Sequence, residues 1–88
     1  MEIQNPQTGA FFPVSGCFNF TLILSQAGTL AFGVDWTKGG DGQELLRDNI
    51  GSGSLLKVRW RTKVYQAIFK TERDKYSNSG RVTLELRP

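Results

Sequence analysis

Two runs of alternating apolar and polar residues lie in the first half of the chain. The apolar positions are every second residue from 18 to 24 and again every second residue from 30 to 36. A period of two is typical of a β-strand with one buried face. If Ser25 pairs with Thr29 around residues 26–28, with Gly28 left-handed, Leu22 faces Phe32 and both apolar sets share one face. The sequence therefore predicts a long β-hairpin in this register.

A short helix is predicted after this hairpin. Residues 37–42 are rich in glycine, which indicates a loop. Asp41 then stands as a candidate N-cap, and Glu44 follows it three residues later, as in a capping box. Leu45, Leu46 and Ile50 continue at helical spacing up to Gly51. We therefore expect one helix of about two turns near residues 42–50.

The second half of the chain predicts more strands. Residues 55–64 alternate, with Leu56, Val58 and Trp60 on one face, and residues 64–70 also have strand character. The alternation slips in phase at positions 64 and 65. Either a tight turn near residues 61–63 or a β-bulge explains this slip, and the sequence does not choose between them.

Two further strands complete the expected set. Residues 10–14 predict a short strand that Pro13 confines to a sheet edge. A polar loop over residues 71–80 precedes a last strand with Val82, Leu84 and Leu86 on one face. The total is five or six strands and one helix, in a single domain over residues 1–88. We predict a small all-β, mainly antiparallel barrel or sandwich, OB-like or SH3-like, because closure hides sheet edges.

The amino-acid composition argues against most enzyme chemistry. The 88 residues include no histidine and one cysteine, so His-based triads, His metal ligands and an intrachain disulfide are excluded. We expect Cys17 to be a small buried hydrophobic residue. The Gly-rich loop at residues 38–42 lacks the known phosphate-binding spacings, and Asp41 would repel a phosphate. We expect no enzyme activity, no cofactor and no metal site.

The location expected for the chain is cytoplasmic. Its first residues are acidic, polar and interrupted by Pro6, unlike a secretory signal. The most apolar stretch, residues 18–24, is far shorter than the ~20 residues that span a bilayer. We therefore expect no membrane partner.

Positive charge is concentrated in the second half of the chain. The net charge of +3 combines a balance of −3 over residues 1–44 with +6 over residues 45–88. The densest part is a row of four cations, at the odd positions from 57 to 63. On one strand face such a row would repeat every ~6.6–6.8 Å. An acid on a neighbouring strand, such as Glu85 or Asp35, would neutralise it.

This row predicts a phosphate track for a single nucleic-acid strand, with tyrosines as stacking surfaces for bases. The polar loop at residues 71–80 would close over that strand. The expected nucleic-acid-binding residues are Lys57, Arg59, Arg61, Lys63, Tyr65, Arg73, Lys75 and Tyr76.

Two other interpretations stay open. The cations are also what a solvent-exposed strand face carries to discourage edge pairing. Alternatively, the chain is a protein-interaction module whose basic face meets an acidic protein surface, or whose Phe11 and Phe12 build a homo-oligomer. Each of these interpretations describes a non-enzymatic binding or structural module.

Overall fold

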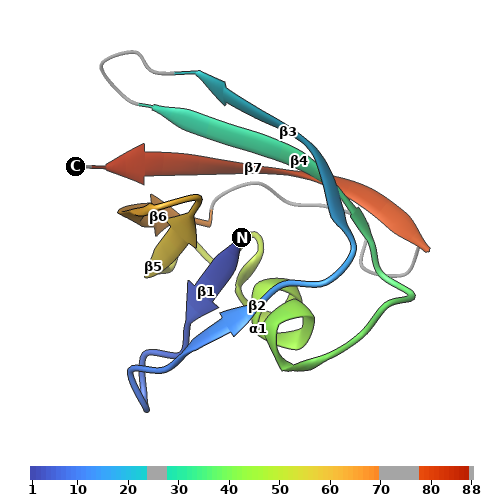
Figure 1. Ribbon diagram of the computed structural model, residues 1–88, viewed down its shortest axis with the longest axis horizontal. Coiled ribbons are helices and arrows are strands. Elements are labelled where there is room, and N and C mark those ends of the chain that lie inside the picture. Colours follow the sequence, from blue (N-terminus) through green and yellow to red (C-terminus); the bar gives the residue numbers. More distant parts are fainter. Residues whose placement is uncertain (24–27, 70–77, 88) are drawn as a thin grey trace.

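The chain folds into one seven-stranded antiparallel sheet and a short helix (Figure 1). The computed structural model describes residues 1–23, 28–69 and 78–87. In chain order the elements are β1 (Glu2–Gln4), β2 (Phe11–Pro13), β3 (Cys17–Ile23), β4 (Thr29–Asp35), α1 (Asp41–Asn49), β5 (Leu55–Trp60), β6 (Lys63–Ile68) and β7 (Ser79–Arg87).

The sheet is open, so the prediction of a closed barrel or a two-sheet sandwich is wrong. The strand order is β2-β1-β5-β6-β7-β4-β3, which leaves β2 and β3 at the two ends. The prediction assumed that closure protects the edges. One edge is instead kept short, because β2 has three residues and ends at Pro13, which lacks a backbone N–H. The mainly antiparallel β class, the edge position of β2 and the short helix are confirmed.

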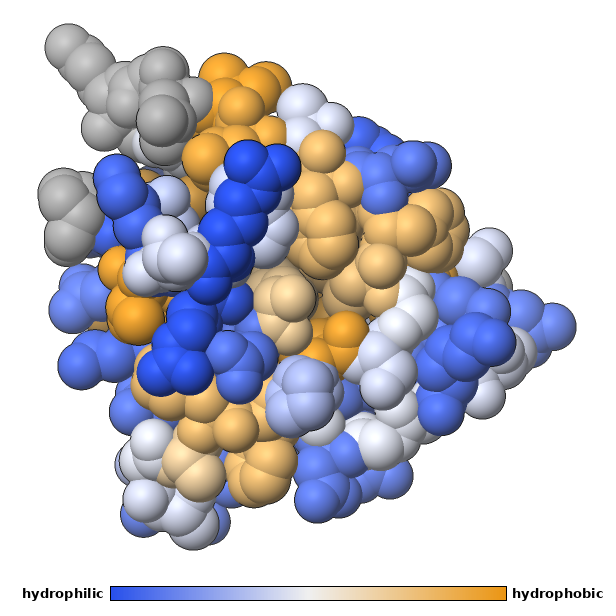
Figure 2. All heavy atoms as spheres, viewed as in Figure 1, coloured by the Kyte–Doolittle hydropathy of each residue, from blue (hydrophilic) through white to orange (hydrophobic). Residues whose placement is uncertain are grey.

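One face of the sheet, the inner face, carries the core. Leu30 pairs with Leu84 and Phe32 with Val82, and all four side chains are buried there. The sheet curls strongly. As a result, the ring of Phe20 on β3 lies 6.0 Å from that of Trp60 on β5, although the two strands are four places apart in the strand order. Figure 2 shows one face of the molecule, on which hydrophobic side chains extend from the upper edge through the middle to the lower edge, with hydrophilic ones on both sides.

The β3–β4 hairpin is confirmed, but its predicted register is wrong. Leu22 lies opposite Leu30 rather than Phe32, and Thr29 pairs with Ile23 rather than Ser25. Residues 24–27, including the predicted turn partner Ser25, lie outside the described residues. The register changes between Phe18 and Thr21, where Asn19 has a left-handed φ of 55°. The error in register therefore begins next to the turn, where Ile23 pairs with Thr29, and the bulge shifts the pairing by one further residue on its far side.

The bulge sends Phe18 to the opposite, outer face. Phe18 pairs with Gly33, and its ring occupies the space where a side chain on residue 33 would stand, 2.6 Å from an ideal Cβ. The ring covers the backbone of Gly33, and Phe18 itself remains 45% exposed. Phe18, which the alternation placed on the shared apolar face, is therefore a surface residue.

The helix α1 covers one end of the inner face. Leu46 and Ile50 are buried in the core, and α1 packs against β1 and β2. Its N-cap is Gly40, with φ 101°, so the prediction of Asp41 as the cap is wrong by one residue. Asp41 and Glu44 instead lie in the first turn, where carboxylates interact favourably with the helix dipole.

The β5–β6 connection is a tight turn, which resolves the alternatives left by the sequence. Trp60 pairs with Lys63, and only Arg61 and Thr62 lie between the strands. Arg61 has a left-handed φ of 59°. The final strand was expected, whereas β1, which lies between β2 and β5, was not.

The turn after β4 makes the stability of the fold dependent on pH. Asp35 Oδ1 accepts hydrogen bonds from the hydroxyl (2.6 Å) and the amide (3.0 Å) of Thr37. These bonds lower the pKa of Asp35 below its ordinary value of 3.8. Their contribution is therefore present above that ordinary value and is lost as the pH falls through the lowered pKa. We expect Thr37→Ala to raise the pKa of Asp35 in an NMR titration, while Thr37→Ser, which keeps the hydroxyl, leaves it low; equal pKa values in both variants would contradict this assignment.

Candidate nucleic-acid interface

The turn at Arg61 and Thr62 divides the predicted row of cations between two faces of the sheet. Directly paired residues share a face, and Arg59 pairs with Val64 while Trp60 pairs with Lys63. Lys57 and Arg59 therefore lie on the outer face. Lys63 lies on the inner face, beside the core. The row would have stayed on one face only if residues 57–63 had formed a continuous strand.

Arg59 is already engaged by neighbouring strands. Its Nη1 donates to Glu2 Oε1 at 3.0 Å, and its guanidinium carbon lies 4.2 Å from the ring centroid of Phe11. The pair with Glu2 is about 40% exposed on each side, so its contribution to stability is small. A neighbouring acid does neutralise part of the row, but it is Glu2 on β1 and neither of the two acids considered from the sequence.

Lys57 is exposed on the same outer face. It lies opposite Gln66 and, with Leu55, borders a small hollow of about 170 Å³. Leu55 and Val64 on this face are 52% and 51% exposed. The outer face of the hairpin is thus a mixed surface of apolar and polar side chains.

A different group of residues comes together at the inner side of the hairpin. We call Trp60, Arg61, Lys63 and Tyr65 the hairpin-tip cluster. The guanidinium carbon of Arg61 lies 4.5 Å from the Trp60 ring centroid, within the range of a cation–π contact. Lys63 is exposed opposite Trp60, and Tyr65 is half-buried opposite Val58. Two aromatic rings and two cations therefore share one end of the hairpin.

The aromatic part of this cluster continues into the core. Trp60 is half-buried, and its ring lies 6.0 Å from the ring of Phe20, which in turn lies 5.2 Å from Phe32. Phe32, the innermost of these three rings, is fully buried. The Trp60 ring is therefore held in place from one side while part of its surface remains accessible to solvent.

Trp60 is the residue that the sequence interpretation left out of the site. Its place in the alternation with Leu56 and Val58 indicated a core residue, and it does pack against the core. Its position as the last residue before the turn is the signal that could have placed it at the rim. Trp36, by contrast, is buried as expected. The predicted contacts Arg73, Lys75 and Tyr76 lie outside the described residues.

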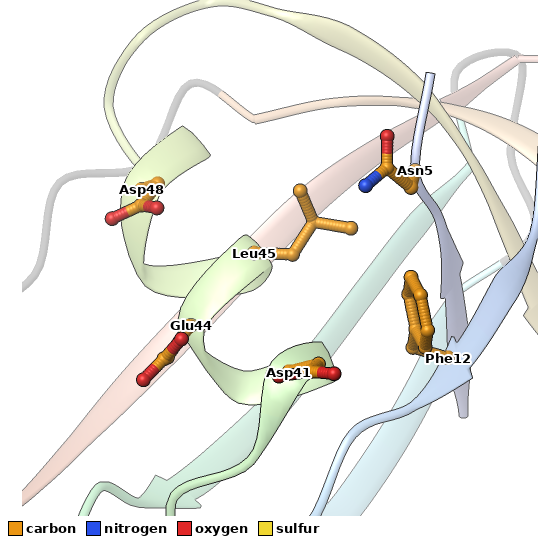
Figure 3. Close-up of a pocket in the computed structure, with 6 residues that line it drawn as sticks. All are labelled: Asn5, Phe12, Asp41, Glu44, Leu45 and Asp48. Carbon is orange, nitrogen blue, oxygen red and sulfur yellow. The ribbon is translucent and has the colours of Figure 1, made fainter. Parts of the chain in front are cut away.

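A hollow lies between α1 and the β1–β2 hairpin (Figure 3). It measures about 250 Å³ and is lined by Asn5, Phe12, Asp41, Glu44, Leu45 and Asp48. Leu45 points from the helix toward the strands, whereas the carboxylates of Glu44 and Asp48 point away from them. The acidic groups do not converge, so this hollow does not present a carboxylate pair for acid–base chemistry.

The described residues add little other chemistry. Burial, opposed by the N-terminal ammonium, raises the pKa of Cys17 to about 11, so its thiol stays protonated and unreactive at neutral pH. Residues 1–23, 28–69 and 78–87 contain no group of three or more acidic or cysteine side chains placed to hold a metal ion. Nor does any helix in these ranges have the length and apolar character needed to cross a membrane.

Comparison with known proteins gives no match: no protein-family model, no curated protein and no solved structure matches the chain. The function is therefore inferred from the residues of this chain alone.

Proposed function

We propose that the chain is a non-enzymatic module that binds single-stranded nucleic acid through the hairpin-tip cluster. The observation that carries the proposal is that Trp60 and Tyr65 share the inner side of one hairpin with Lys63, while Arg61 lies over the Trp60 ring. Unpaired bases stack on aromatic side chains, and cations beside the rings bind the phosphates of the same strand.

The energies favour this surface over the outer face. Stacking of a base on an aromatic side chain contributes ~1–3 kcal/mol. Trp60 is anchored through Phe20, so little side-chain entropy is lost when a base stacks on it. On the outer face, a phosphate would have to displace Glu2 from Arg59. We therefore place the phosphate contacts at Arg61 and Lys63 and remove Lys57 and Arg59 from the expected footprint.

Charge reversal on the two faces of the hairpin tests the proposal. Affinity for a fluorescent single-stranded oligonucleotide is measured by anisotropy across a salt series. We expect Lys63→Glu to weaken binding about tenfold and to make the salt dependence less steep, because one phosphate contact is lost. Lys57→Glu is the matched control, since it makes the same charge change at an exposed position of the same hairpin on the outer face. Its effect should stay below about threefold.

Three results would contradict the proposal. One is the absence of binding to any oligonucleotide at low salt. Another is an equal loss of affinity in Lys57→Glu and Lys63→Glu, which would indicate a general effect of net charge. The third is unchanged affinity in Tyr65→Leu, a variant that keeps an apolar side chain against the core but removes a stacking ring. Thermal unfolding of each variant separates a loss of contact from a loss of fold.

A further inference from the structure

We infer that β3 is a self-association edge, at which two copies of this chain pair antiparallel about a two-fold axis. Strand β3 lies at the end of the strand order and, within the described strands, pairs with β4 on one side. It has seven residues, compared with three in β2 at the other end. An edge strand presents unpaired backbone N–H and C=O groups, which are complementary to those of another edge.

This edge carries a bulge but lacks the charged residues and prolines that usually protect an edge strand against pairing. Exposed edge strands are commonly blocked by lysine, by proline or by inward-pointing charges. Strand β3 contains neither a charged residue nor a proline. The uncharged stretch is in fact much longer, since the sequence has no Asp, Glu, Lys or Arg from Ile3 to Val34. The bulge near Asn19 shifts the register between Phe18 and Thr21 but leaves Thr21, Leu22 and Ile23 in regular register with β4.

The distribution of charge favours a second copy as the partner. Two molecules that each carry +3 repel one another most where their cations meet. The cations lie on the elements after α1 begins, apart from Lys38, whereas β3 and its neighbour β4 contribute one charged residue, Asp35 at the end of β4. Two copies that pair through β3 therefore meet at strands that carry no positive charge.

The exposed side chains of β3 are self-complementary. Phe18 and Ile23 lie near opposite ends of the strand, are 45% and 56% exposed, and both face outward from the core. In an antiparallel pair whose two-fold axis lies at Leu22, in the middle of the regular segment, Ile23 of each copy faces Thr21 of the other. The two Ile23 side chains then flank the shared backbone hydrogen bonds, and the two sheets become continuous.

Sedimentation equilibrium of the full chain without nucleic acid tests this inference. The wild type is expected to reach a mass twice the 9.8 kDa of one chain at millimolar concentration. Ile23→Lys should weaken the dimer at least about tenfold, because two lysines are placed at the paired edges. Val64→Lys is the matched control, since Val64 is 51% exposed on the outer face but belongs to β6, which pairs with β5 and β7 and not with β3. It should leave the dimer intact.

Each other outcome overturns the inference. A wild type that stays monomeric at millimolar concentration shows that the edge does not pair with itself. A dimer that survives Ile23→Lys, or that is lost equally in Val64→Lys, uses another surface or responds to net charge. Amide hydrogen exchange gives a second readout, because protection of the β3 amides should rise with protein concentration in the wild type and not in Ile23→Lys. None of these measurements depends on nucleic-acid binding.

Discussion

Gly42→Ala is expected to lower the free energy of unfolding by about 3 kcal/mol, although alanine is the better helix former. Gly42 lies in the first turn of α1 and is buried against β2. A Cβ at this position would overlap the carbonyl oxygen of Pro13 and would lie 2.8 Å from its carbonyl carbon. Both atoms belong to the backbone, so no side-chain rotation relieves the overlap and the helix must move away from the strand.

Two opposing effects determine the expected change in the free energy of unfolding. Replacing glycine by alanine inside a helix contributes about 1 kcal/mol of stability, whereas this overlap with backbone atoms is expected to cost about 4 kcal/mol, above the ~1–3 kcal/mol of a typical overpacked side chain. For a domain of this size a net loss of about 3 kcal/mol lowers Tm by roughly 15 °C. Glu44→Ala is the control, because Glu44 is exposed in the same turn and its replacement should change stability by less than about 1 kcal/mol. Calorimetry of both variants decides the matter, and a Tm for Gly42→Ala within a few degrees of the wild type would show that α1 does not rest on β2 this closely.

The sequence predicted well the elements that depend on local pattern. The alternation in residues 17–36 indicated both strands of the β3–β4 hairpin, and the spacing of Leu46 and Ile50 indicated α1. Pro13 marked an edge strand, as found. These features need only neighbouring residues, because the period of the pattern matches the period of the backbone.

The features that the sequence missed depend on contacts between distant segments. The predicted hairpin register is wrong because Ile23, rather than Ser25, pairs with Thr29 next to the turn; the left-handed Asn19 then shifts the pairing again and moves Phe18 to the outer face over Gly33. The pattern alone gave no reason to expect a bulge there. Strand β1 was missed because three residues are too few for a periodic signal, and its place in the sheet is set by pairing with β5, more than fifty residues later in the chain.

The candidate site shows the same limit. The prediction placed all four cations of the row on one strand face and left a tight turn or a bulge open, whereas the turn divides the row between two faces. A two-residue turn keeps Lys63 on the face of Trp60 and separates it from Lys57. The ion pair of Arg59 with Glu2 likewise joins the N-terminal strand to β5 and has no signature in the local sequence. Sequence thus located the hairpin, and only the three-dimensional pairing shows which side of it combines rings with cations.

Gln43 is the buried polar residue that connects the loops around α1, and its replacement should cost nearly as much as Gly42→Ala. Its side chain is 1% exposed. Gln43 Oε1 accepts from the Gly39 amide at 2.7 Å, and Nε2 donates to the carbonyl oxygens of Ser15 at 3.0 Å and Asp35 at 2.7 Å. One side chain therefore satisfies backbone groups from the segment before β3, the end of β4 and the loop before the helix.

We expect Gln43→Leu to destabilise the fold by about 2–4 kcal/mol, because three backbone groups lose a partner while the apolar volume is roughly kept. Gln43→Glu should be at least as unstable at neutral pH, since it places a carboxylate against the two carbonyl oxygens that now accept from Nε2. Burial and these oxygens raise the pKa of the introduced carboxyl in the folded state, so the folded state favours the protonated form. The deficit of Gln43→Glu must then shrink as the pH falls below that raised pKa, where the protonated group can donate to one carbonyl, while the deficit of Gln43→Leu stays constant. Urea unfolding of both variants relative to the wild type between pH 4 and pH 8 measures this difference; parallel deficits across the range would show that the amide group of Gln43 does not make these buried contacts.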